Sequence, residues 1–150
     1  MELEKELQTT KFKSEVHKAT LNILFTAYWL KTRMGGHFKV FGLTPEQYNV
    51  MRILKGKHPE KMCVKDIGSR MIEKNSNVPR ILDRLVRKDI VERQQSSVDR
   101  RETQCCLTEK GLGLLSKIND FIDVKESTMI NLDEETARAL NTILENARNV

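Results

Sequence analysis

The spacing of apolar residues over the first quarter of the chain predicts one long helix. Between Lys11 and Met34, apolar side chains recur every three or four residues, which places them on one stripe of a helix. A second apolar set widens this stripe and consists of Leu21, Leu24, Phe25 and Tyr28. A stripe of this width needs two neighbouring helices or a second subunit to cover it. Gly35 and Gly36 are expected to end the helix.

The segment "LTPEQYNVMRILKGK" contains the clearest helix start in the chain. Thr44 is placed to cap the helix, Pro45 suits the first helical position, and Gln47 completes a capping box. A loop is expected over residues 56–61. A short apolar run at 62–64 then leads into "KDIGSRMI", which predicts a helix of about two turns.

The segment "NSNVPRILDRLVRKDIVER" is predicted to form a helix with one apolar and one charged face. At about 100° per residue, the apolar face contains Val78, Ile81, Leu82 and Leu85. The opposite face contains Ser76, Arg80, Asp83, Arg84 and Arg87. Pro79 is compatible with a helix only within its first turn, so Ser76 is the expected N-cap.

Two β-like runs, residues 90–95 and 103–107, follow this helix and predict a hairpin. The loop between them carries a dense charge cluster made of Asp99, Arg100 and Arg101. After the hairpin, Thr108 and Asp133 are the expected N-caps of two further helices.

Composition and charge narrow the class of function. With 150 residues, 39% hydrophobic and 31% charged, the chain has room for one domain of ordinary size but not for a two-domain enzyme. Residues 65–101 hold ten Lys and Arg against six Asp and Glu, whereas residues 119–150 hold three against seven. This segregation favours a module that binds a polyanion, with a solvated charged surface as the alternative. No spacing suggests an acid/base pair or a nucleophile, so an enzyme is not expected.

The sequence also bears on compartment and metals. No apolar run reaches the roughly 20 residues of a membrane span, and the N-terminus lacks the order of a secretory signal. We therefore expect a cytoplasmic protein with no membrane partner. Cys63, Cys105 and Cys106 are expected to be reduced, and no Cys or His spacing predicts a metal site or another cofactor.

A short helix, a second helix with exposed arginines and a hairpin are the parts of a winged helix-turn-helix. The expected fold class is therefore mainly α (α+β). In four segments the chain resembles the MarR family, the multiple antibiotic resistance regulators: "LTPEQYNVMRIL", "VKDIGSRM", "NSNVPRILDRLVRKDIVER" and "SSVDRRETQCCLTEKG".

The resemblance extends over nearly the whole length of the chain. It implies one domain over residues 1–150, with a DNA-binding part at 40–107 and dimerisation helices at 10–36 and 108–150. It further implies a sequence-specific transcriptional regulator, more commonly a repressor, that binds a palindromic operator in double-stranded DNA as a homodimer. Small phenolic or other ligands often lower the DNA affinity of such proteins.

The recognition helix supplies most of the predicted DNA contacts. Its N-terminal residues reach base edges in a helix-turn-helix, so Ser76, Asn77 and Arg80 are predicted to read sequence. Arg84 and Arg87 lie further along and are predicted to meet phosphates, together with Lys65 of the preceding helix. The alternative is that these arginines are solvated and paired with Asp83 by helical spacing.

The wing supplies a second set of predicted contacts. Arg100 or Arg101 is predicted to enter a minor groove, whose negative potential rises where the groove narrows. Asp99 would repel phosphate, so its expected role is to hold an arginine through charge-assisted hydrogen bonds. The resemblance agrees with this role, because the family's wing carries the same Asp-x-Arg pattern, matched here by Asp99 and Arg101.

Two departures from the family pattern affect the expected geometry. The family usually has glycine where this chain has Asp89, and Asp89 is expected to keep the left-handed turn at some energetic cost. Pro79 replaces a hydroxyl residue that can touch DNA in relatives, which removes one potential contact.

Other functional readings stay open from sequence alone. A small aromatic effector could bind among aromatic and apolar side chains, which could equally be plain core: Tyr28, Trp29, Tyr48 and Met51. A winged helix that binds proteins, or nucleic acid without sequence preference, is one alternative. A regulator that senses oxidants through a cysteine is another.

Overall fold

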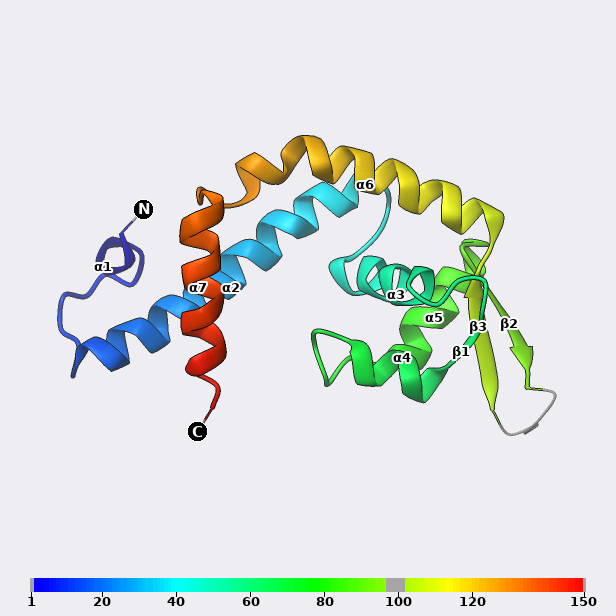
Figure 1. Cartoon of the computed structure of the whole chain (residues 1–150), viewed down its shortest axis with the longest axis horizontal. Coiled ribbons are helices and arrows are strands. Elements are labelled where there is room, and N and C mark those ends of the chain that lie inside the picture. Colours follow the sequence, from blue (N-terminus) through cyan, green and yellow to red (C-terminus); the bar gives the residue numbers. More distant parts are fainter. Residues whose placement is uncertain (1, 97–101, 150) are drawn as a thin grey trace. The chain divides into compact units, whose positions relative to one another are not determined.

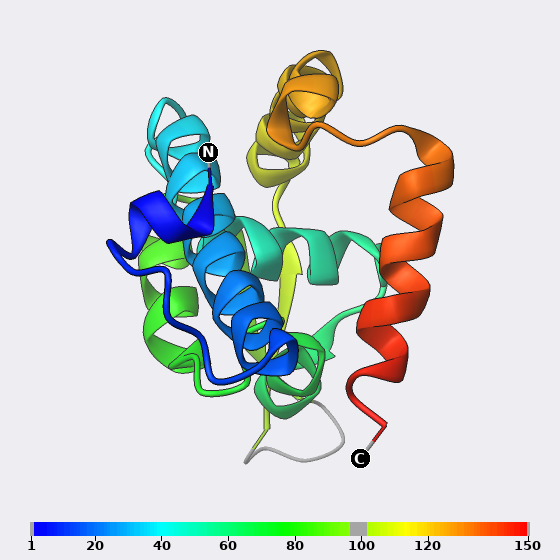
Figure 2. The ribbon, with the colours of Figure 1, turned by 90° about the vertical axis from the view of Figure 1, so that its left-hand side faces the viewer.

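The long N-terminal helix, α2, spans Glu15–Lys39 in the computed structural model, which describes residues 2–96 and 102–149. The predicted end at Gly35 and Gly36 is wrong, because α2 continues through both glycines. The last turn is anchored by Phe38, which is fully buried and stacks on Tyr48 with ring centroids 4.4 Å apart. A short helix, α1 (Leu3–Glu6), precedes α2; in Figure 2 α1 is dark blue and α2 runs from blue to cyan.

Helix α3 (Pro45–Lys55) begins as predicted. The hydroxyl of Thr44 accepts a hydrogen bond from the Gln47 N–H at 3.3 Å, and the Gln47 side chain accepts one from the Thr44 N–H at 3.0 Å. The capping box is therefore confirmed. A short strand, β1 (Met62–Cys63), follows and leads directly into α4 (Val64–Arg70).

Helix α5 (Val78–Arg87) is the predicted recognition helix, but it begins one residue later than expected. The N-cap is Asn77, whose side-chain oxygen accepts a hydrogen bond from the Arg80 N–H at 3.1 Å. Ser76 instead belongs to the preceding turn, because its N–H donates to the carbonyl of Glu73. Pro79 lies in the first turn of α5, where a proline removes no helical hydrogen bond.

The hairpin strands are β2 (Val91–Gln95) and β3 (Thr103–Leu107), as the alternating pattern predicted. They pair antiparallel from Val91 with Leu107 to Gln95 with Thr103, and β1 adds a third strand on the other side of β3. Asp89, between α5 and β2, has φ +58°, which confirms the left-handed turn predicted despite the missing glycine. Figure 1 shows the hairpin strands side by side next to α5.

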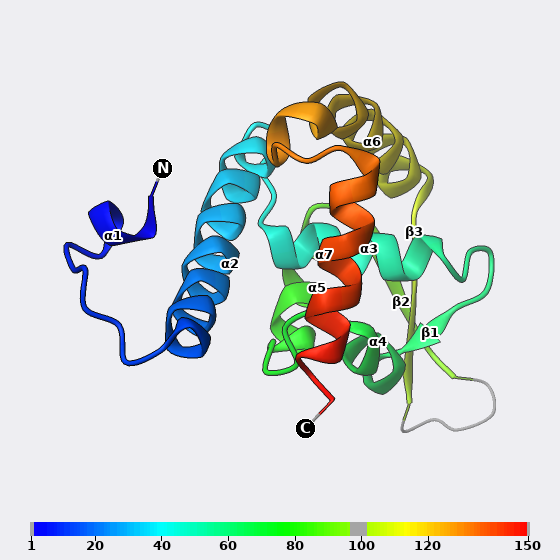
Figure 3. The same ribbon diagram turned by 60° about the vertical axis from the view of Figure 1, so that its left-hand side comes forward.

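The core lies where α3, α4 and α5 meet the sheet, and Figure 3 shows these helices beside the strands. α5 contributes Leu82 and Leu85, both without exposed surface, and α3 contributes Val50 and Met51. Burying a leucine side chain stabilises the fold by about 1.5–3 kcal/mol. The apolar face of α5 therefore holds this helix against the body and leaves its charged face outside.

By internal contacts the chain divides into two units, residues 1–118 and 119–150. Helix α6 (Glu109–Met129) crosses this boundary, and α7 (Glu134–Asn146) lies wholly in the second unit. The predicted caps are confirmed at both helices. The Thr108 hydroxyl accepts a hydrogen bond from the Gly111 N–H at 3.0 Å, and Asp133 accepts one from the Thr136 N–H at 2.7 Å.

Candidate nucleic-acid interface

The outer face of α5 presents three arginine side chains to solvent. Arg80, Arg84 and Arg87 are all exposed, and at about 100° per residue they fall within an arc of roughly 60°. Among the described residues, none of the three forms an ion pair, although the Nε of Arg87 donates to the backbone carbonyl of Asp83 at 3.3 Å. Their charges are therefore available to a polyanion.

Asp83, the acid on the same helix, is paired with a residue from the wing. The Nη1 atom of Arg93, on β2, lies 2.6 Å from the Oδ1 atom of Asp83. The other terminal nitrogen of Arg93 donates to the backbone carbonyl of Pro79 at 3.0 Å. The alternative in which Asp83 pairs with the arginines of its own helix is therefore not what the structure shows.

Arg93 was missed by the sequence-based prediction, although a signal for it exists. Strand side chains alternate between faces, so Arg93 shares a face with Val91, which is buried. A guanidinium on the inward face of a strand needs an acceptor from a neighbouring element. Asp83, the exposed acid of the preceding helix, could have been identified as this acceptor.

The predicted DNA-contacting residues that precede α5 differ in how exposed their side chains are. Asn77 is exposed, but its side-chain oxygen is used by the helix cap. The hydroxyl oxygen of Ser76 is buried and has no hydrogen-bond partner among the described residues. Lys65 is exposed in the first turn of α4. The structure thus leaves Lys65 accessible and gives no support to Ser76 as a base-reading residue.

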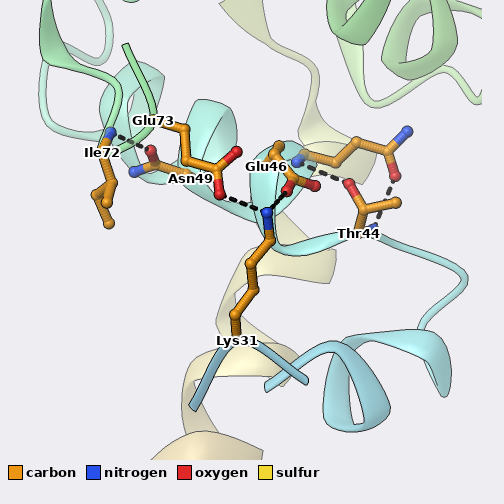
Figure 4. A network of polar contacts seen from close by, with 7 residues as sticks. Lys31, Thr44, Glu46, Asn49, Ile72 and Glu73 are labelled. Atoms are coloured by element: carbon orange, nitrogen blue, oxygen red, sulfur yellow. Dashed lines mark hydrogen bonds and ion pairs between the residues drawn. The ribbon is translucent and has the colours of Figure 1, made fainter. Parts of the chain in front are cut away.

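The turn that leads into the recognition helix is held by a polar network (Figure 4). Lys31 of α2 forms ion pairs with Glu73 of this turn and with Glu46 of α3, the latter at 3.2 Å. Hydrogen bonds to the carboxylates of Glu73 and Glu46 raise the pKa of Lys31. The side chain of Asn49, also on α3, accepts a hydrogen bond from the Ile72 N–H at 3.0 Å. This network links the turn to both α2 and α3.

Two cavities flank the recognition helix, with volumes of about 280 and about 610 Å³. Four residues line both of them: Thr44, Gln47, Arg80 and Arg84. The smaller cavity is also lined by Glu73 and Ser76, and the larger cavity is also lined by Lys88.

The four residues considered for an effector pocket lie elsewhere. None of Tyr28, Trp29, Tyr48 and Met51 lines either of these cavities. Tyr28 is exposed, Met51 belongs to the core, and Tyr48 stacks on Phe38.

The predicted wing-tip residues Asp99, Arg100 and Arg101 lie outside the described residues, so their roles stay predictions. The two strands that lead to them are described in full. After Gln95 the ladder continues with a hydrogen bond from the Ser96 N–H to the Glu102 carbonyl at 3.0 Å. The pairing of the two strands therefore extends to Ser96 and Glu102.

The two adjacent cysteines of β3 are both buried. Burial raises the pKa of the Cys105 thiol. Burial, together with a hydrogen bond that the thiol donates to Glu92 at 3.1 Å, raises the pKa of Cys106 to about 11. Both residues are therefore thiols rather than thiolates at neutral pH, and the thiolate is the form that reacts with oxidants. Cys63 is only partly buried.

These thiols allow a direct chemical test. In the folded protein at pH 8, iodoacetamide is expected to label Cys63 first and to leave Cys105 and Cys106 unmodified until the protein is denatured. Peptide mass spectrometry after timed quenching measures this order. Rapid labelling of Cys106 in the folded protein at this pH would contradict a raised pKa.

Within residues 2–96 and 102–149, every helix is too short or too polar to span a membrane. No group of three or more His, Cys, Asp and Glu side chains there could hold a metal ion.

A short helix, a recognition helix with exposed arginines and a two-stranded wing together define a winged helix-turn-helix protein of the DNA-binding class. A model of the MarR family matches residues 43–103. Over 110 residues the chain is 32% identical to the HTH-type transcriptional regulator MhqR of Bacillus subtilis, covering 71% of this chain and 73% of MhqR. The chain therefore belongs to the MarR family, whose members are transcriptional regulators and not enzymes.

Solved structures agree on the fold. A MarR transcription factor from Planctomyces limnophilus superposes with a TM-score of 0.70 at 26% identity. The superposition covers 93% of this chain and 100% of that one. A mutant MarR from E. coli, crystallised with operator DNA, superposes with a TM-score of 0.79 at 17% identity, covering 93% of this chain and 99% of its own. The fold class predicted from the sequence is confirmed.

Proposed function

We propose that this regulator binds a palindromic operator as a homodimer and represses transcription in the cytoplasm. The observation that carries the proposal is the exposed arginine face of α5 beside the wing strands. With the N-terminus of α5 in a major groove, Arg80 reaches base edges, while Arg84, Arg87 and Lys65 contact phosphates. The E. coli MarR mutant, which shares this fold, was crystallised with operator DNA, and this supports DNA as the proposed partner.

A second copy of the chain is the proposed partner of α2. One side of this helix exposes four large apolar side chains: Val16, Ile23, Leu24 and Tyr28. Several large apolar side chains exposed on one helix are typical of a protein interface. A dimer would place two copies of α5 about one helical turn of DNA apart, roughly 34 Å, which is the spacing that a palindromic operator requires.

Release from DNA is proposed to follow the binding of a small effector. The two cavities beside α5 are lined by Arg80 and Arg84, so a ligand in either lies against the DNA-binding helix. Such a ligand acts only by binding more tightly to a conformation in which the two recognition helices do not fit successive major grooves.

The DNA-binding proposal is tested by titrating the protein against a fluorescein-labelled duplex that wild-type protein has selected from a random library. Arg80→Ala is expected to weaken binding about tenfold to hundredfold, because a bidentate contact to guanine contributes about 1–3 kcal/mol. Arg101→Ala is expected to weaken binding as well. Lys55→Ala serves as the matched control, because it removes one exposed positive charge from the far end of α3.

The same titration separates the alternatives. Equal affinity of the wild-type protein for the selected and for a scrambled duplex would indicate binding without sequence preference. Unchanged affinity and salt dependence in the Arg80→Ala, Arg101→Ala double variant would instead favour a winged helix that binds protein, and the repressor proposal would be abandoned.

A further inference from the structure

We infer that Arg93 is a positioning residue for DNA binding: it neutralises Asp83 on the recognition helix and locks wing strand β2 to the first turn of that helix. This inference rests on the proposed function and adds a residue that does not itself touch DNA. Arg93 would hold the wing and the recognition helix together so that both face the DNA.

The geometry gives Arg93 two anchors on the same helix. One terminal nitrogen lies 2.6 Å from the Asp83 carboxylate, and the other donates to the Pro79 carbonyl at 3.0 Å. Pro79 lies in the first helical turn, and Asp83 lies one turn further along. Because a guanidinium is a planar fork, the two bonds fix both the distance and the orientation of β2 relative to α5. A lysine has one charged nitrogen and cannot reproduce both contacts with the same geometry.

Asp83 needs a partner because of where it lies. Its side chain is 52% exposed, and at about 100° per residue it sits roughly 60° from Arg80 around α5. An unpaired carboxylate there would face the DNA phosphates and repel them, and like charges brought together at an interface lower affinity. The Arg93 side chain is only 28% exposed, and both of its terminal nitrogens are engaged by α5. These contacts point to a screening role rather than to a phosphate contact.

A double-mutant cycle tests the inference with the same selected duplex. Arg93→Ala is expected to weaken binding about tenfold, because Asp83 is then uncompensated. Asp83→Asn alone should stay within about threefold of wild type, and Asp83→Asn combined with Arg93→Ala should recover to a similar level. Arg93→Lys should fall between wild type and Arg93→Ala. Thermal unfolding of each variant ensures that binding is measured on folded protein.

The salt dependence distinguishes screening from direct contact. Each phosphate contact contributes about 0.9 to the slope of log K against log salt concentration. If Arg93 only screens Asp83, the double variant keeps the wild-type slope. A slope smaller by about 0.9, or a double variant as weak as Arg93→Ala, would overturn the inference, because Arg93 would then bind phosphate or act without Asp83.

The outcome is separable from that of the proposed function. If wild-type protein selects no duplex, the proposed function fails. If wild type binds and Arg80→Ala weakens binding, but Arg93→Ala behaves like the Lys55→Ala control, the proposed function stands and only the role of Arg93 is refuted.

Discussion

Gly111→Ala is expected to destabilise the folded protein by about 3 kcal/mol, since it adds a methyl group where no space exists. Gly111 is buried in the first turn of α6, where its N–H donates to the Thr108 hydroxyl. A Cβ at this position would overlap the carbonyl oxygen of Ile90 and lie 3.1 Å from its carbonyl carbon. The obstacle is backbone at the start of the wing, so a side-chain rotation cannot relieve it.

Gly113→Ala is the matched control for this prediction. Gly113 lies two residues further along α6, and no atom comes within 4 Å of a Cβ built there. Alanine should therefore stabilise the helix by about 0.5–1 kcal/mol. In thermal unfolding, the melting temperature of Gly111→Ala should be roughly 6–12 °C below that of wild type. The melting temperature of Gly113→Ala should be unchanged or raised. Equal melting temperatures for the two variants would show that α6 shifts away from Ile90 without cost.

The reason for this tight contact is the junction between the recognition helix, the wing and α6. The Thr108 hydroxyl caps α6 and also donates to the carbonyl of Asp89 at 2.7 Å, in the left-handed turn after α5. One side chain therefore joins the end of the recognition helix to the start of α6. Close packing of Gly111 on Ile90 completes the joint.

The parts of the fold that could be predicted depend on short-range chemistry. The capping box at Thr44 and the caps at Thr108 and Asp133 involve residues three apart, which a sequence pattern displays directly. The end of α2 could not be predicted, because the packing of Phe38 on Tyr48 carries the helix past two glycines. Tertiary contacts of this kind override local propensity.

In the candidate site, too, some features could be predicted from the sequence and others could not. The arginine face of α5 follows from helical periodicity, and the structure presents Arg80, Arg84 and Arg87 as the periodicity indicated. The start of α5 was misplaced because both Ser76 and Asn77 are good caps, and the choice depends on the turn made with Glu73. The partners of Asp83 and of Glu73 come from β2 and α2, so they depend on how the chain folds back.

Leu24→Asp is expected to convert the proposed dimer into a monomer and to weaken binding to the selected duplex about hundredfold. Leu24 is 63% exposed in the middle of the apolar stripe of α2. A carboxylate buried in a dimer interface without a partner costs several kcal/mol. A monomer also loses the second half-site contact, which in a dimer is intramolecular and increases affinity by about 10²–10⁴.

Val40→Asp separates loss of the interface from loss of an exposed apolar residue. Val40 caps the C-terminus of the same helix, is 76% exposed, and lies about 160° around the helix axis from Leu24. It should therefore keep the wild-type mass in light scattering at micromolar concentration and the wild-type DNA affinity. If Leu24→Asp also keeps both, α2 does not form the dimer interface. If its mass falls to that of a monomer while its affinity is unchanged, one copy of α5 and its wing suffices for binding, and the palindromic operator is refuted.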